Sequence, residues 1–127
     1  KFTPRLTFWN KSAEEPKPTK VPDGHALKWT DAAGKAWLLF CNPFPTMRCP
    51  ATYEAWKDPS TWEPLTPDRR VLTAEGKPVE AHGGDLAWHP WSRRWLLLFT
   101  QKGGDSSYLG EIWLASAPSP TTFPCGT

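Results

Sequence analysis

The sequence has little surplus charge and no long apolar run. Its net charge is +2, and charged residues make up 22% of the 127 positions. A nucleic-acid-binding surface needs a clustered basic patch, whereas the Lys and Arg residues here are scattered. A membrane-spanning helix needs about 20 consecutive apolar residues, and no stretch approaches that length. These absences argue against nucleic acid and membrane as partners.

Helical periodicity is also missing, because no stretch of about twelve residues keeps an amphipathic pattern free of Pro and Gly. The chain instead contains fifteen prolines, nine glycines and nine tryptophans. Disordered chains are poor in aromatic residues, so the tryptophans indicate a packed core. Frequent turn residues combined with many aromatics predict short strands joined by turns in an all-β fold.

Cysteine is scarce, with three residues. Cys41 and Cys49 flank a loop between two predicted strands, and pairing of those strands would bring them within disulfide reach. The alternatives are a disulfide or two reduced, partly buried thiols. Cys125 is left over, as a free thiol or as a link between chains. The chain shows no signal peptide and begins at Lys1, which suits a processed product and favours an extracellular or periplasmic protein.

Four strands are predicted in the first half, after a connection rich in Lys, Glu and Pro at residues 10–23. A further short strand is predicted at residues 5–9. The first two main strands form a hairpin around an Asp- and Gly-containing turn. The four main strands are predicted at residues 24–29, 35–41, 51–56 and 61–65.

The second half repeats the order of the first with a shift of about 59 positions, which predicts an internal duplication and two halves, 1–66 and 67–127, in one structural unit. Without a gap, Gly24, Leu27, Trp29 and Leu38-Leu39-Phe40 match Gly83, Leu86, Trp88 and Leu97-Leu98-Phe99. With small adjustments, Glu54-Ala55-Trp56 matches Glu111-Ile112-Trp113, Thr61-Trp62 matches Thr122-Phe123, and Arg5-Leu6-Thr7 resembles Arg70-Val71-Leu72-Thr73.

Four short strands per repeat are the signature of a β-propeller blade. Continuous apolar strands such as residues 37–40 must be covered on both faces, as in the middle of a blade. A propeller ring has about four to eight blades, so two blades do not close one. Alone, they would leave two apolar faces exposed. We therefore expect a β-propeller-like pair of four-stranded antiparallel blades. Ring closure would come from head-to-tail association of copies or from the remaining blades of a longer chain.

Several segments carry a family resemblance. Residues 37–40 and 54–65, with 84–88, 93–99 and 110–115, resemble the five-bladed propellers of the arabinanase, invertase and levansucrase type. In particular, they are similar to uncharacterised bacterial secreted propellers related to those glycosidases. In that family, three axial carboxylates act as base or nucleophile, general acid and pKa modulator. The resemblance implies that Asp85 is one of them, although Ala26 stands at the equivalent position of the first repeat.

Three functions follow as expectations. The chain is a carbohydrate-binding or structural module, with Asp85, His25 and His82 at a channel mouth and Trp91 exposed in a turn to stack on a sugar. Alternatively, it is a glycosidase-like fragment that uses Asp85, or an assembly unit without a ligand. Glycoside hydrolysis needs two carboxyl groups roughly 5–9.5 Å apart, so a single inner carboxylate argues against catalysis by this chain.

Purely structural interpretations compete with each of these sites. Asp85 can cap backbone amides at a strand start. Its spacing to His82 and His89 matches no zinc signature, so the sequence predicts neither a metal nor another cofactor. Glu54 and Glu111 are interpreted as structural charges. The strand tryptophans are most simply packing residues.

Overall fold

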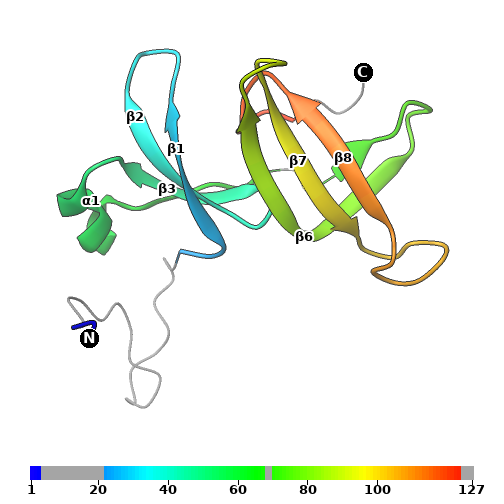
Figure 1. The fold of residues 1–127 in the computed structure, drawn as a ribbon, viewed down its shortest axis with the longest axis horizontal. Helices are drawn as coiled ribbons and strands as arrows, with labels where there is room; N and C mark the ends of the chain where they lie inside the picture. Colours follow the sequence, from blue (N-terminus) through cyan, green and yellow to red (C-terminus); the bar gives the residue numbers. More distant parts are fainter. Residues whose placement is uncertain (4–21, 68–69, 124–127) are drawn as a thin grey trace.

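The computed structural model describes residues 1–3, 22–67 and 70–123, which form two four-stranded antiparallel sheets (Figure 1). Sheet I has the strand order β1-β2-β3-β4, and sheet II has the order β5-β6-β7-β8. The predicted all-β fold with two such sheets is confirmed. The strands are β1 (His25–Thr30), β2 (Ala36–Cys41), β3 (Pro45–Pro50), β4 (Glu63–Pro64), β5 (Arg70–Leu72), β6 (Pro78–His89), β7 (Arg94–Gln101) and β8 (Ile112–Ala117).

Asp31 organises the turn of the β1–β2 hairpin. Its Oδ1 accepts hydrogen bonds from the backbone N–H groups of Ala33 and Lys35, at 3.0 and 2.9 Å. Its Oδ2 accepts a third from Trp37 Nε1 at 2.9 Å. The pKa of Asp31 lies below its ordinary value, chiefly because of the hydrogen bond from Trp37 and next because of the one from the Lys35 backbone. Each of these bonds favours the ionised carboxylate. The turn is thereby tied to the first large side chain of β2.

Residues 51–56, predicted as a strand, lead into a helix instead. Helix α1 (Tyr53–Lys57) begins after Thr52, whose Oγ1 accepts from the backbone N–H of Ala55 at 3.1 Å. This N-cap satisfies a donor that the start of a helix leaves free. Glu54 and Lys57 add an ion pair along the helix. The strand prediction is wrong because this local capping outweighs the strand propensity of the aromatic residues.

The third strand of sheet I is β3, which lies mostly in the segment predicted as a loop. Pro45 and Pro50 stand at its two ends, where a strand tolerates Pro. Between them Met47 and Cys49 are buried and Arg48 is half-buried, which is the alternation of a strand. The predicted fourth strand at 61–65 shortens to β4, which follows the 3₁₀ turn η1 (Pro59–Thr61).

Sheet II takes its fourth strand from before β6 rather than from after β8. β6 begins at Pro78, not at the predicted Gly83, and its first part pairs with β5. A register shift between Ala81 and Gly84 separates this part from the longer pairing with β7. Gly84 is needed there, because a Cβ would lie 2.0 Å from the carbonyl oxygen of Leu98. After β8, the described residues form only an isolated bridge, Ser119 to Thr122, where the sequence predicts a strand.

The two hairpins differ by one residue in their turns. Thr30 pairs with Ala36 in sheet I, whereas His89 pairs with Arg94 in sheet II. Trp29 therefore pairs with Trp37, and Trp88 pairs with Trp95. The shift of 59 thus relates β1 to β6, but a shift of 58 relates β2 to β7.

We call the two faces of each sheet front and back. In each sheet, the second hairpin strand is β2 or β7, and it pairs with the first hairpin strand, β1 or β6. The front is the face that carries the side chains of those β2 or β7 residues whose backbone N–H and C=O groups hydrogen-bond to the first hairpin strand. Ala36 O accepts from Ala51 N, towards β3, so the next residue, Trp37, bonds to β1 and marks the front. Gln101 N donates to Glu111 O, towards β8, so Leu98 bonds to β6 and marks the front of sheet II. Trp95 then lies on the back, and the matched tryptophans of the two hairpins occupy opposite faces.

The front of sheet I packs against the back of sheet II in one buried cluster. The two sheets therefore stack front to back, and this contact forms the main core between the two halves seen in Figure 1. The sheet I residues of the cluster are Trp37, Leu39, Cys41 and Phe44, with Leu27 and Trp29 at its margin; those of sheet II are Val79, Ala81, Leu86, Trp95, Leu97 and Phe99, with Trp113 and Ala115.

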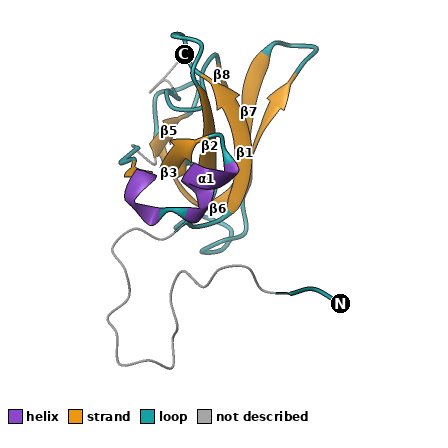
Figure 2. Ribbon diagram, turned by 90° about the vertical axis from the view of Figure 1, so that its left-hand side faces the viewer, coloured by secondary structure: helices purple, strands orange, loops and turns teal. Residues whose placement is uncertain are grey.

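The back of sheet I is covered by the connection between β3 and β4. Trp56 in α1 stacks on Phe40 with ring centroids 5.3 Å apart, and Trp62 is 1% exposed. Trp62 Nε1 donates to the carbonyl oxygen of Trp56 at 3.2 Å. Figure 2 looks onto this back face and shows α1 lying over β2 and β3. A second buried cluster, with Met47 and Cys49, forms beneath this cap.

Candidate functional site

The exposed edges of the two sheets meet at His25 and Asp85. His25 begins β1, and Asp85 lies in β6 just after the register shift. His25 Nε2 is 2.9 Å from Asp85 Oδ1 and 3.3 Å from the carbonyl oxygen of Leu86. Asp85 Oδ1 also accepts from the backbone N–H of Leu86 at 2.9 Å. Asp85 therefore binds a backbone N–H of its own strand and contacts the first strand of the other sheet at the same time.

This pair is open to solvent, with 39% of the His25 side chain and 68% of the Asp85 side chain exposed. An exposed carboxylate beside an imidazole can accept and donate hydrogen bonds to a polar ligand such as a sugar hydroxyl. Its near partner is a histidine, whereas glycoside hydrolysis needs a second carboxyl group roughly 5–9.5 Å away.

Of the two alternatives for Cys41 and Cys49, the disulfide is wrong, because the structure has both as free, buried thiols. Cys41 pairs with Pro45 at the end of the hairpin and belongs to the front of sheet I, whereas Cys49 pairs with Leu38 and belongs to the back. Strand pairing therefore places the two side chains on opposite faces. Cys125 lies outside the described residues.

Both thiols lie in environments that disfavour the thiolate. Burial, and secondarily the negative charge of Asp85, raise the pKa of Cys41 to about 12. Burial also raises the pKa of Cys49. A thiol with a raised pKa is a poor nucleophile near neutral pH, so neither residue is suited to covalent chemistry.

The other predicted ligand residues do not join the His25–Asp85 contact. His82 is exposed at the register shift of β6. Trp91 lies in the β6–β7 turn, is 90% exposed and meets the His89 ring edge-on at 6.3 Å between centroids. From Asp85 to His89 the strand spans about 13 Å, at about 3.3 Å per residue. The predicted site is therefore divided between two places along β6.

No group of three His, Cys, Asp or Glu side chains within the described ranges could hold a metal ion. No helix in the part of the chain that the structure describes is long and apolar enough to cross a membrane.

The front of sheet II is a bare apolar surface. Leu98, Ile112 and Leu114 are 50%, 72% and 65% exposed, and they lie side by side on β7 and β8. The sequence predicts two exposed apolar faces; the cap covers most of the back of sheet I, whereas Leu98, Ile112 and Leu114 stay exposed here. The sequence signal was the continuous apolar run Ile112-Trp113-Leu114-Ala115, which predicts burial on both faces.

A second apolar hollow remains on the back of sheet I, beside the cap. This groove has a volume of about 350 Å³, and Tyr53, which is 60% exposed, stands at its edge. Its lining is almost entirely apolar and consists of Ala26, Lys28, Leu38, Ala51, Thr52, Tyr53 and Trp56.

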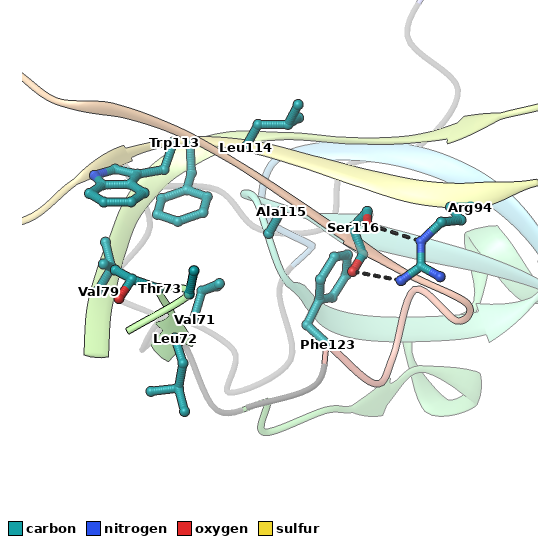
Figure 3. Close-up of a pocket in the computed structure, with 12 residues that line it drawn as sticks. Val71, Leu72, Thr73, Val79, Arg94, Trp113, Leu114, Ala115, Ser116 and Phe123 are labelled. Atoms are coloured by element: carbon teal, nitrogen blue, oxygen red, sulfur yellow. Dashed lines mark hydrogen bonds between the residues drawn. The ribbon is translucent and has the colours of Figure 1, made fainter. Parts of the chain in front are cut away.

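A third hollow, which we call the edge groove, lies in sheet II between β5 and β8 and has a volume of about 300 Å³. In Figure 3, Val71 and Leu72 of β5 lie across it from Trp113 and Ala115 of β8. No sequence pattern indicates this hollow, because it depends on β5 and β8 both being edge strands.

Comparisons with models of protein families, with curated protein sequences and with solved structures gave no match.

Proposed function

We propose that the chain is an assembly unit of propeller type, which associates with further copies by front-to-back stacking of sheets. The observation that carries this proposal is the bare front of sheet II beside a core built by the same kind of contact. Within the chain, the front of sheet I is covered by the back of sheet II. Leu98, Ile112 and Leu114 lie on the one front that nothing in the described chain covers.

The groove beside α1 supplies the other half of the contact. It lies on the part of the back of sheet I that the cap leaves open, so a front seated there would make a second front-to-back contact. The exposed leucines offer apolar side chains to Leu38 and Trp56 in its lining. Such a contact is heterologous, and its repetition gives a ring where the rotation closes and an open row where it does not. This arrangement resembles the closure expected of a propeller fragment.

The test uses two variants that each disable one half of the contact. Leu98→Lys places a charge on the front, and Tyr53→Lys places one at the groove. Tyr108→Lys is the matched control, because Tyr108 is 63% exposed in a loop outside both surfaces. Sedimentation velocity at rising concentration should show association of the wild type and of Tyr108→Lys, with at least tenfold weaker association of the other two variants.

A mixture of the two disabled variants decides the geometry. Leu98→Lys has an intact groove and Tyr53→Lys has an intact front, so the groove of the first variant can bind the front of the second. The mixture should therefore form one-to-one dimers and nothing larger. A wild type that stays monomeric at about 100 μM contradicts the proposal. A dimer that Leu98→Lys abolishes and Tyr53→Lys leaves intact indicates front-to-front packing and contradicts it as well.

Carbohydrate binding is the second candidate, supported by the exposed His25–Asp85 pair. Its expected location is the edge where β1 meets β6, with hydrogen bonds from sugar hydroxyls to Asp85. A glycan array should show binding by the wild type that Asp85→Ala abolishes. Binding unchanged in Asp85→Ala, or none in either protein, counts against it. Hydrolysis of arabinan or fructan that Asp85→Asn lowers by several orders of magnitude would favour the glycosidase alternative instead.

A further inference from the structure

The outer edge of β8 has unused backbone groups. Glu111 O accepts from Gln101 N across β7, so Ile112 and Leu114 direct their N–H and C=O groups to the opposite side. In the described part of the chain no strand pairs with β8 on that side. Exposed edges of this kind are templates for a further strand.

The edge groove faces a second free edge. Thr73 N donates to Lys77 O across the β5–β6 hairpin, so Leu72 in β5 directs its backbone groups away from β6. Leu72 lines the same hollow as Leu114. The edges of β5 and β8 therefore border one space of about 300 Å³, as Figure 3 shows.

The wall of this space is apolar. Val79, Phe99, Trp113 and Ala115 line it from the back of sheet II, and Phe123 lines it as well. In an extended strand every second side chain points to the same face. A strand laid along β8 would thus place alternate side chains against this apolar wall.

Sheet I shows what occupies the corresponding position. There β3, the third strand of the meander, carries β4 on its outer edge, with Met47 paired to Pro64 and Arg48 to Glu63. The described residues after β8 form only the Ser119–Thr122 bridge. Within the described ranges, sheet II therefore has a vacant strand position where sheet I has a strand.

Arg94 gives the edge groove a charge preference. Its Nε donates to Ser116 Oγ at 2.9 Å, and its Nη2 donates to the carbonyl oxygen of Ser116 at 3.2 Å. No Asp or Glu is among the described residues that line the groove. A carboxylate on the occupant therefore finds an arginine at this end and no repelling charge.

We propose that the edge groove binds an extended peptide from a partner protein, by addition of a strand to β8. The peptide has apolar residues at alternate positions and a carboxylate next to Arg94. Backbone hydrogen bonds to Ile112 and Leu114 would supply affinity, and the apolar wall would select side chains. This site uses the edge of sheet II, so it does not depend on the association through the front.

The experiment selects displayed random octapeptides on the full-length chain. Enriched peptides are synthesised and titrated against the protein, with copies N-methylated at alternate residues. Hydrogen exchange of the free and peptide-bound protein reports on the amides of Ile112 and Leu114. Variant Ala115→Trp fills the groove, and Ala87→Trp, at an exposed position of β6, is its matched control.

We expect the selection to enrich peptides with alternating apolar residues. Ala115→Trp should bind these peptides at least tenfold more weakly than the wild type, and Ala87→Trp should bind them with unchanged affinity. N-methylation in one of the two alternating registers should weaken binding tenfold or more even if Ala115→Trp folds poorly. Peptide should slow exchange of the Ile112 and Leu114 amides. Arg94→Gln should weaken acidic peptides several-fold, and Arg93→Gln in the turn should not.

Three results would overturn the proposal. One is the absence of any peptide enriched on the wild type over Ala115→Trp. Another is binding that tolerates N-methylation in both registers, which excludes strand addition. The third is slow exchange of the Ile112 and Leu114 amides in the protein alone, which means that this chain or a second copy already fills the position.

Discussion

Sheet I has its front covered by sheet II and most of its back covered by a cap, whereas the front of sheet II has no cover among the described residues. The strands do not explain this difference, since both sheets have apolar residues on both faces of their middle strands. The difference lies in the cover over the face that the contact between the sheets leaves free. In sheet I, α1 and η1 in the β3–β4 connection bring Trp56 and Trp62 over the back. In sheet II, the free face is the front, and no described connection lies over its Leu98, Ile112 and Leu114. Coverage of a sheet here is therefore a property of its connection.

The magnitudes favour association through the uncovered face. Full burial of a Leu or Ile side chain contributes about 1.5–3 kcal/mol. Leu98, Ile112 and Leu114 are each at least half exposed, so several kcal/mol of burial remain to be gained. An affinity in the micromolar range corresponds to about 8 kcal/mol, and part of the gain is lost in ordering the partners. These three side chains alone fall short of that figure, so we expect weak association, to be sought at concentrations up to about 100 μM.

Removal of the cap on sheet I should have the largest effect on stability. Trp62→Ala deletes a side chain that is 1% exposed and leaves a cavity over Phe40 and Met47. We expect a loss of about 3–5 kcal/mol in the free energy of unfolding, measured by urea titration. Trp91→Ala is the matched control and should change stability by less than about 0.5 kcal/mol, because Trp91 is 90% exposed. Similar losses in the two variants would refute the capping role.

The packing of β6 against β7 should be the next most sensitive feature. Gly84→Ala places a Cβ 2.0 Å from the carbonyl oxygen of Leu98, so the backbone must shift. We expect a loss of about 1–3 kcal/mol in the free energy of unfolding. In Gly83→Ala the nearest atom is Asn42 Oδ1 at 3.4 Å, so this neighbouring variant should be nearly neutral. A neutral Gly84→Ala would show that β6 and β7 are less tightly paired at this position than their register indicates.

The two cysteines report separately on the two faces of sheet I. In a Cys125→Ser background, alkylation of Cys41 and Cys49 should be slow at neutral pH, because both are buried and both have raised pKa values. Adding Trp62→Ala should raise the alkylation rate of Cys49 at least tenfold and leave the alkylation of Cys41 slow. Mass spectrometry of the labelled peptides distinguishes the sites. Equal acceleration of both thiols would mean that the cap and the sheet interface open together.

The smallest expected effect concerns the turn at Asp31. The pKa of Asp31 is lowered in the folded state, so its contribution to stability is present above the ordinary pKa of 3.8 and is lost as the pH falls through the lowered value. Asp31→Ala should therefore be less stable than the wild type at pH 7, with a difference that shrinks in acid. Asp31→Asn retains a turn-forming oxygen and should lose less. Urea titrations between pH 2 and pH 7 measure this, and a difference that grows in acid would contradict it.

Much of the architecture could be predicted from local patterns. The hairpins around Asp31 and Trp91 follow from turn residues between apolar runs, and His25 lies at the start of β1 as predicted, whereas Asp85 lies within β6 because that strand begins at Pro78. The sequence does not predict the helix after β3 because the aromatic residues Tyr53 and Trp56 favour a strand, and the deciding signal is the single Thr52 cap.

Other features depend on pairing register, which composition does not determine. A difference of one residue between the two turns places Trp29 and Trp88 on opposite faces, although the sequence aligns them. The same dependence separates Cys41 from Cys49. The edge groove arises because the fourth strand of sheet II precedes β6, and only the three-dimensional order of strands shows this.

The front-to-back order of the two sheets gives the molecule a direction. A linear row of copies joined by this contact has unlike ends, and each added copy covers one exposed front while bringing another. The number of bare fronts therefore stays at one, however long the row becomes. A longer row therefore still exposes one apolar front. Only closure of the row into a ring, or a terminating partner, covers that last front.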